Sequence, residues 1–303
     1  MNTTNAGKNK SLFALALISA VMSVLFSFMG APFLRAFANA TPSRFFWLTA
    51  GLLVGAMFAL GFAGSENYKI SETAVYVGAI WMTLGAYSEF EKRGTGWRMA
   101  SLFSLLAGLV FAFAGYFLVL KNLGSSALLT ELVQPLKEAW LKAFPESKLQ
   151  AENLAVYIPG MFAASLLGSL ALGFVFETKV ARLFGLKRER VASSLRWLEF
   201  RLPDVVIWLT LFSALLTLDL FTGSAALWLK TISVNWLIFA VVAFFIQGLT
   251  VTEFMMRFYR FGPFTRLITY LLIALQLAPF IAFAGFVDYW ADFRRLVRKK
   301  TKA

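Results

Sequence analysis

The stretch Arg201-Leu202-Pro203-Asp204-Val205-Val206-Ile207-Trp208 decides the fold, because it ends a strongly basic segment and opens an apolar run. Proline is tolerated in the first turn of a helix, where its missing N–H leaves no bond unmade, and an acid beside it suits the positive end of the helix dipole. The apolar run has the length and composition of a membrane span. We therefore predict a helix that begins at Pro203 and enters a membrane.

The rest of the chain repeats this composition. Of 303 residues, 59% are hydrophobic and 17% aromatic, more apolar than soluble domains usually are. The apolar runs are long and lack strict alternation, which favours helices over barrel strands. We predict an all-α, polytopic transmembrane helix bundle of about eight membrane helices. The expected spans are Ser11–Gly30, Phe45–Gly64, Thr73–Phe90, Met99–Leu120, Leu154–Phe176, Pro203–Phe221, Ile232–Thr252 and Thr265–Val287.

One further helix is expected outside the spans. In the polar insertion Lys121–Asn153, apolar residues recur at helical spacing opposite charged ones, which predicts an amphipathic helix that lies in the interface or folds over the bundle as a lid. The whole chain, 1–303, is expected to form one membrane domain. Its parts are a five-helix region (1–176), a basic connector (177–202) and a three-helix region (203–303).

The distribution of basic residues indicates how the chain is oriented in the membrane. Lys and Arg number 29 against 16 Asp and Glu, and the connector Glu177–Leu202 carries seven of the basic residues. Between apolar spans such charge favours anionic lipid headgroups as the partner rather than nucleic acid. Eight full crossings would divide the basic residues almost equally between the two sides, which conflicts with the positive-inside rule. The conflict disappears if Ser11–Phe37 or Thr265–Val287 does not cross once. We place Glu89–Arg98, the connector and Glu253–Arg266 in the cytoplasm, and the sides of the termini stay open.

Enzymatic motifs are missing. The sequence has no Cys and no His, which removes thiolate nucleophiles, Cys/His zinc sites and Ser-His-Asp triads. It also lacks a P-loop, an HExxH and a GxSxG motif. We expect no enzyme activity and no cofactor. Asp288 and Asp292 lie at the i, i+4 spacing of a metal site, but the neighbouring arginines favour ion pairs instead.

Those arginines define a candidate structural network. Asp288, Asp292 and Arg295 share one stripe of a continuous helix that leaves the membrane, beside interfacial aromatic residues. We predict a partly buried network in preference to a solvated helix cap. Its members are Arg201, Asp288, Asp292, Arg294 and Arg295.

Polar residues inside the expected spans are candidates for a ligand cavity, since polar groups in lipid are costly. These are Asn235, Gln247, Glu253 and Gln276. The alternative is that each forms a hydrogen bond between helices.

Small residues indicate close helix packing. Ala16 and Ala20, with Ser19 and Ser23 on a neighbouring stripe, form a candidate face for a partner helix. Gly51-xxx-Gly55-xxx-Ala59 and Gly160-xxx-Ala164-xxx-Gly168 are expected to pack inside the bundle.

Three blocks in the C-terminal third carry a resemblance. Arg201–Trp208, Gln247-Gly-Leu-Thr-Val-Thr-Glu-Phe254 and Gly285-Phe-Val-Asp-Tyr-Trp-Ala-Asp-Phe-Arg294 resemble the RLP-x-x-x-x-W, QG-L-x-x-x-H-F and G-x-x-D-x-W-x-D-F-R blocks of the YybS-like family of bacterial polytopic membrane proteins. Glu253 stands where that family usually has His. The family is similar to the S-components of energy-coupling-factor transporters, and the Ala16-xxx-Ala20 face is similar to the one by which S-components dock. The resemblance implies a multi-pass protein of the bacterial inner membrane.

Two functions follow as hypotheses. In the first, the chain is a small-solute-binding transport subunit that works with a separate transmembrane/ATPase module. In the second, it is a structural or assembly protein that acts through helix–helix and lipid contacts. Convergence of the polar candidates on one cavity would favour the first, and their dispersal over helix contacts the second.

Overall fold

The described part of the chain is helical throughout. The computed structural model describes residues 3–63, 68–123, 134, 137–138, 154, 156–186, 197–218 and 227–300, and within them there is no strand. Five helical segments are long and apolar enough to cross a membrane, or six if one bent pair is a single span. The sequence-based number of about eight is therefore not confirmed. The expected interfacial helix at Lys121–Asn153 lies almost wholly outside the described residues.

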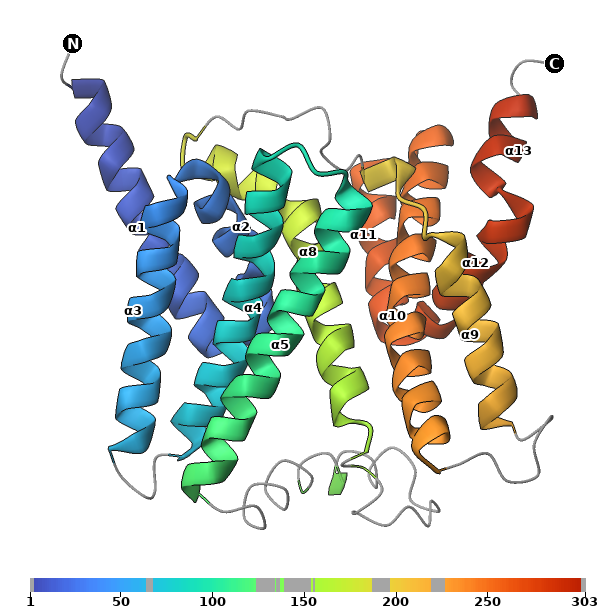
Figure 1. Cartoon of the computed structure of the whole chain (residues 1–303). Helices are drawn as coiled ribbons and strands as arrows, with labels where there is room; N and C mark the ends of the chain where they lie inside the picture. The colour runs from blue at the N-terminus through green and yellow to red at the C-terminus, as the bar shows by residue number, and fades with distance from the viewer. Residues whose placement is uncertain are drawn as a thin grey trace. The chain divides into compact units, whose positions relative to one another are not determined.

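The chain divides into two compact units (Figure 1). Unit 1 comprises Met1–Ile158 and Ser165–Ser194, and unit 2 comprises Pro159–Ala164 and Leu195–Ala303. Unit 1 contains α1 (Thr3–Phe26), η1 (Ser27–Gly30), α2 (Ala31–Ala40), α3 (Ser43–Phe62), α4 (Tyr68–Lys92), α5 (Trp97–Leu123) and most of α8 (Ile158–Leu183). Unit 2 contains η2 (Trp197–Glu199), α9 (Asp204–Thr217), α10 (Leu227–Phe258), α11 (Pro263–Leu272), η3 (Ile273–Leu277), α12 (Ala278–Ala291) and α13 (Phe293–Lys300).

Two expected spans are not among the helices that are both long and apolar enough to cross a membrane by composition, for different reasons. The helix α4 is long, with 25 residues, but it does not pass as an apolar span. It forms the core of unit 1, where residues such as Ala74, Ile80 and Leu84 are fully buried, and a helix covered by protein needs less apolar surface than one facing lipid. The helix α9 is apolar but has only 14 residues, too few for a hydrocarbon core about 30 Å thick. It begins at Asp204, one residue after the predicted start, and Pro203 is its extended N-cap residue and not part of the first turn.

The first apolar region folds back on itself. The chain breaks at Ser27, whose φ is +49°, and α2 then packs against α1 so tightly that a Cβ on Gly30 would lie 2.7 Å from the Ser23 backbone N. Seven residues of continuous helix would separate these positions by about 10 Å. Helix α2 therefore runs back toward the end of the unit from which α1 comes (Figure 1). This corrects the single crossing expected at Ser11–Gly30.

The last apolar region also fails to cross once as a straight helix. Helices α11 and α12 are joined through the π-helical turn η3 and bent by 40°. At its start, α11 places Arg266 3.9 Å from Glu253 of α10, and beyond α12 the Arg298 guanidinium lies 5.3 Å from the ring centroid of Phe254. Both ends of the pair thus lie beside one turn of α10. The expected straight span Thr265–Val287 is corrected to a broken one.

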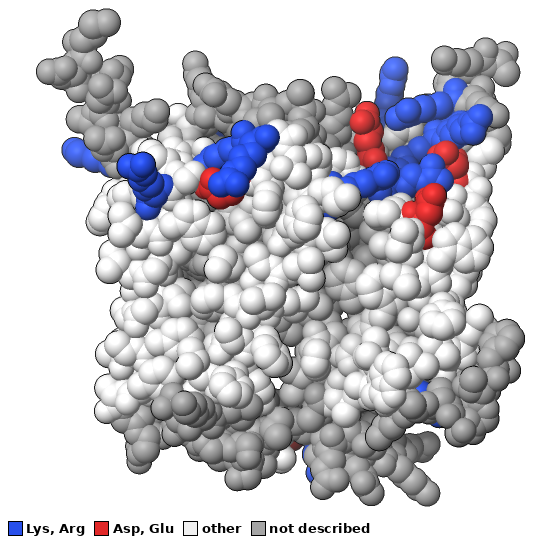
Figure 2. All heavy atoms as spheres, viewed as in Figure 1, with Lys and Arg blue, Asp and Glu red and all other residues white. Residues whose placement is uncertain are grey.

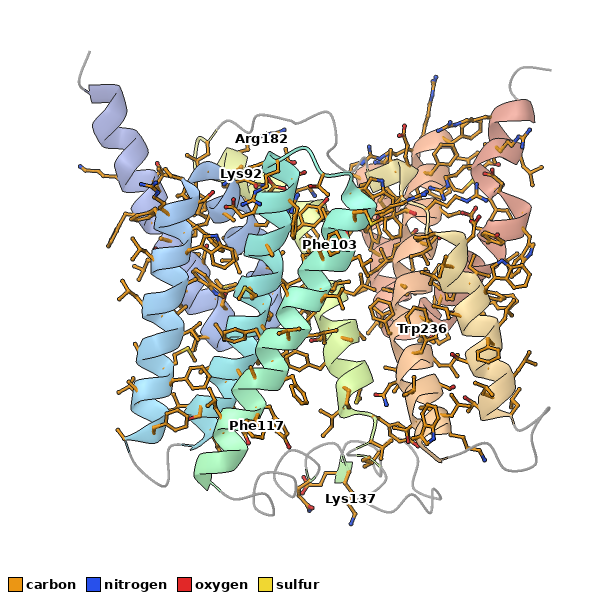
Figure 3. All side chains as sticks on the ribbon, viewed as in Figure 1. Lys92, Phe103, Phe117, Lys137, Arg182 and Trp236 are labelled. Atoms are coloured by element: carbon orange, nitrogen blue, oxygen red, sulfur yellow. The ribbon has the colours of Figure 1, made fainter. Side chains whose placement is uncertain are left out.

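These two foldbacks bring most described basic residues of each unit to one end (Figure 2). In unit 1 Lys92 and Arg182 mark that end, and Phe117 lies toward the other end of α5 (Figure 3). Among the described residues, the basic residues at the opposite end are Lys69, Lys121 and Lys137 in unit 1 and Lys230 in unit 2 (Figure 3). Folding back of the terminal regions is what the sequence required to satisfy the positive-inside rule.

The two small-residue stripes that were expected to pack inside the bundle differ from each other. Gly51 and Gly55 have open space where a Cβ would stand, so this face of α3 lies on the surface and not inside the bundle. Gly160 does pack closely, since its Cβ would lie 2.7 Å from the carbonyl oxygen of Asn235.

Candidate functional site

An ionic cluster is buried in unit 1, where the folded-back helix α2 meets α4 and α8. The side chain of Arg35 on α2 is 1% exposed. Its Nε donates to Glu177 Oε2 at 2.8 Å and its Nη2 donates to Glu91 Oε2 at 3.0 Å. One guanidinium thus joins carboxylates from two other helices, and such charge-assisted bonds are about twice as strong as neutral ones.

Further hydrogen bonds hold the C-terminal end of α2. Asn39, one helical turn after Arg35, donates from Nδ2 to the other oxygen of Glu177 at 2.6 Å. Lys92 of α4 donates from Nζ to the carbonyl oxygens of Ala38 and Thr41, at 2.9 and 3.3 Å. The last carbonyls of a helix lack partners within it and carry partial negative charge, so an ammonium group there satisfies them. Arg35 and Lys92 balance the charges of the two carboxylates.

One donor of the cluster, Arg35 Nη1, is buried and has no hydrogen-bond partner among the residues that the structure describes. The guanidinium carbon lies 4.6 Å from the ring centroid of Tyr87 and 4.4 Å from that of Phe174, so aromatic faces surround it on two sides. Cation–π attraction offsets part of the lost hydration. A buried donor that stays unpaired is nevertheless uncommon, and it marks Arg35 as more than a packing residue.

The three blocks quoted from the C-terminal third meet in unit 2. Gln247 on α10 accepts from the Leu202 backbone N at 2.9 Å and donates to Gly285 O at 3.0 Å and Asp288 Oδ2 at 3.2 Å. Arg294 donates to the same Asp288 oxygen at 2.8 Å. These contacts use both ends of the buried amide, so Gln247 works as a structural connector.

Two glycines permit this junction. A Cβ on Gly248 would collide with Ile281 O, and one on Gly285 would collide with Phe244 O. Backbone atoms therefore touch where α10 and α12 cross, a contact that only glycine allows at these positions. Arg294 completes the junction by donating to the carbonyls of Leu198 and Phe200 at 3.0 and 2.9 Å.

The predicted network of Arg201, Asp288, Asp292, Arg294 and Arg295 divides into a buried half and an exposed half. The side chains of Asp288 and Arg294 are buried together, with Arg294 Nη2 at 2.8 Å from Asp288 Oδ2. Arg201 and Asp292 are 3.4 Å apart with side chains 40% and 33% exposed, and Arg295 is exposed. The continuous helix expected through Arg295 is wrong, because Asp292 has φ +41° and ends α12.

The predicted ligand-lining residues do not converge. Asn235 accepts from the Gly160 backbone N at 2.5 Å, and Gln247 belongs to the junction above. Glu253 accepts from Arg257 Nε at 2.5 Å and from the Tyr270 hydroxyl at 2.6 Å. Gln276 lies exposed in η3. Three of the four therefore form contacts between or along helices.

The predicted partner-helix face is covered by the chain itself. Ser19 and Ser23 are fully buried and Ala16 nearly so, whereas Ala20 is partly covered. Ser23 Oγ accepts from Trp81 Nε1 at 3.2 Å, which ties α1 to α4. This face packs inside unit 1.

Sequence reasoning missed the Arg35 cluster. Glu91 was placed in the turn Glu89–Arg98 and Glu177 in the connector, both on the side assigned to the cytoplasm, whereas Arg35 was assigned to no side. The shared side of the two acids was the one available signal. Nothing in the pattern paired them.

Apolar helices of membrane length together with ion pairs buried among them define a multi-pass integral membrane protein. The family model described as "Predicted membrane protein (DUF2232)" matches residues 11–289. The chain therefore belongs to this family of predicted membrane proteins. No curated protein and no solved structure matches it.

Proposed function

We propose that the chain is a small-solute-binding subunit of the bacterial inner membrane and that the Arg35 cluster is its solute site. The observation that carries this proposal is a nearly fully buried arginine with one unpaired nitrogen, held on a half-helix that folds back within an apolar region. Half-helices and buried ionisable groups among membrane helices are features of transporter binding sites, and here they lie at the basic end of unit 1.

The geometry of the Arg35 cluster limits the chemical class of the ligand. A solute that engages Arg35 would compete with Glu91 or Glu177 for the guanidinium, so we expect it to carry an anionic group. Ligand entry would require α2 to move, and with 10 residues α2 is short enough to shift without unpacking the longer helices. Because the sequence has no P-loop, energy for transport would come from a separate transmembrane/ATPase module.

A second candidate is a structural or assembly protein that acts through helix–helix and lipid contacts. The dispersal of Asn235, Gln247 and Glu253 over contacts within unit 2 favours it. In this case the Arg35 cluster would serve only to pin α2. Neither candidate involves catalysis.

Thermal unfolding of the purified protein in the presence of small molecules separates the two candidates. A ligand that binds only the folded state raises the midpoint in proportion to its occupancy. We expect a member of a panel of anionic solutes to raise it, and matched neutral and cationic solutes to leave it unchanged. The exposed Arg44→Met variant should respond like the wild type and Arg35→Met should not. A panel with no effect on the wild type would favour the assembly function.

A further inference from the structure

The turn between α10 and α11 has an unusual backbone. Helix α10 ends with a Phe261 N–H to Met256 O bond of 2.9 Å and an Arg260 N–H to Arg257 O bond of 3.1 Å. These two bonds form a helix-ending motif that needs one residue in the left-handed conformation. That residue is Arg260, with φ +54°.

Two other helices of the chain end in the same way with glycine. After α4 the left-handed residue is Gly94, with φ +78°, and after α8 it is Gly185, with φ +66°. An L-residue with a side chain is strained in this conformation, whereas glycine is not. Arginine at position 260 therefore destabilises the turn compared with glycine, and such strain points to a use for the side chain.

Arg260 shares its turn with other cationic residues. Arg257 and Arg266 flank it, and the acid nearby is Glu253, which accepts from Arg257 and lies 3.9 Å from Arg266. Within the described residues, Arg260 forms no side-chain hydrogen bond or ion pair of its own. The turn thus carries three guanidinium groups against one carboxylate, an excess of positive charge.

The same turn carries exposed aromatic residues. Tyr259 is 61% exposed and Phe264 71%, and Phe261 is also exposed. Guanidinium groups beside exposed rings, at the end of a membrane helix, match the boundary between lipid headgroups and acyl chains. A soluble anion would use the charges but not the rings.

We propose that the α10–α11 turn, Arg257–Arg266, is a binding site for an anionic phospholipid. Arg260 and Arg266 bind the phosphate of the headgroup, and Tyr259 and Phe264 contact the upper acyl chain. Charge complementarity and the adjoining apolar rings select this occupant, and the strained Arg260 is the residue that the site requires. The proposal concerns unit 2 and is independent of the function proposed for the Arg35 cluster.

The test uses the full-length protein in a neutral detergent, with phosphatidylglycerol, phosphatidylcholine or free glycerol phosphate added before thermal unfolding. We expect phosphatidylglycerol to raise the midpoint more than phosphatidylcholine does, and glycerol phosphate to have no effect. Without lipid, Arg260→Gly should unfold at a temperature equal to or above that of the wild type, because the strain is gone. It should also lose most of the shift due to phosphatidylglycerol.

The control is Arg295→Gln, which removes an exposed cation outside the turn and should keep the full shift. If Arg260→Gly does not yield folded protein, Arg266→Gln replaces it, with retained phosphatidylglycerol counted by native mass spectrometry. The proposal is overturned if Arg260→Gly keeps the whole shift, if phosphatidylcholine acts equally well, or if glycerol phosphate alone reproduces the effect. The last result would show a soluble-anion site.

Discussion

Arg35 donates a hydrogen bond of 2.8 Å to Glu177 across a sequence separation of 142 residues, and it does so where almost no solvent reaches. This bond ties the folded-back half-helix α2 to α8, and the second bond to Glu91 ties it to α4. The arrangement of unit 1 therefore depends on charges that composition alone would assign to the surface.

Removing the Arg35 side chain should lower the stability of the folded protein. Arg35→Met leaves two buried carboxylates without their common partner, and breaking a buried ion pair in this way costs about 3–5 kcal/mol. The thermal unfolding midpoint should fall clearly, while that of the exposed Arg44→Met should stay near the wild type. The charge-free triple variant Arg35→Met/Glu91→Gln/Glu177→Gln should recover much of the loss, because apolar or neutral replacements of a whole buried ion cluster are often tolerated. Equal midpoints for Arg35→Met and Arg44→Met would contradict the burial of the cluster.

Asp288 and Asp292 should respond differently to the same change. Asp288→Asn weakens the bonds to Arg294 and Gln247 in a buried junction, so we expect a loss of about 3–5 kcal/mol. Asp292→Asn affects a partly exposed pair, and such pairs contribute about 0–1 kcal/mol. Asparagine also tolerates the left-handed conformation at position 292. A larger loss of stability in thermal unfolding for Asp292→Asn than for Asp288→Asn would contradict the placement of Asp288 in the buried junction and Asp292 in the exposed pair.

Gly248 and Gly285 should be intolerant of even a methyl group. Gly248→Ala forces a Cβ into the backbone of α12 at Ile281, so α10 and α12 must separate, and overpacking typically costs about 1–3 kcal/mol. Gly55→Ala is the matched control, since it adds the same methyl group to a membrane helix with open space around it. Yield and unfolding midpoint in detergent measure both. If the two substitutions behaved alike, the close crossing would not exist.

Both termini should lie on the cytoplasmic side. The foldback of α1 on α2 places the N-terminal end of unit 1 with the basic turn at Gly94, and the bent pair returns the chain to the basic end of unit 2. Reporters fused at either terminus or inserted at Gly96 should therefore read as cytoplasmic under the positive-inside rule. A reporter at Ala63, after α3, should read as external. Opposite readings for the two termini would mean that one terminal region crosses.

Parts of the fold follow directly from sequence pattern. The start of α9 lies within one residue of its predicted position, at Asp204 after Pro203, because proline and a following acid mark a helix N-terminus locally. The three C-terminal blocks meet in unit 2, and Gln247, Gly248 and Gly285 within them explain that meeting by hydrogen bonds and close backbone contact.

Other parts of the fold could not be predicted from the sequence pattern. Hydrophobic windows detect how apolar a run is but not whether it turns back, so the break at Ser27 was hidden inside an acceptable span. Local sequence pattern likewise does not show which helix ends share a site. The pairing of Arg35 with Glu91 and Glu177 depends on tertiary packing, and no local rule predicts it.

Native mass spectrometry of the wild type beside the triple variant Arg35→Met/Glu91→Gln/Glu177→Gln, both purified in mild detergent with matched unfolding midpoints, tests the proposed solute site most directly. The account predicts a small anionic molecule retained by the wild type and missing from the folded, charge-free variant. Retention of the same molecule by both proteins, or by neither, would contradict a solute site at Arg35.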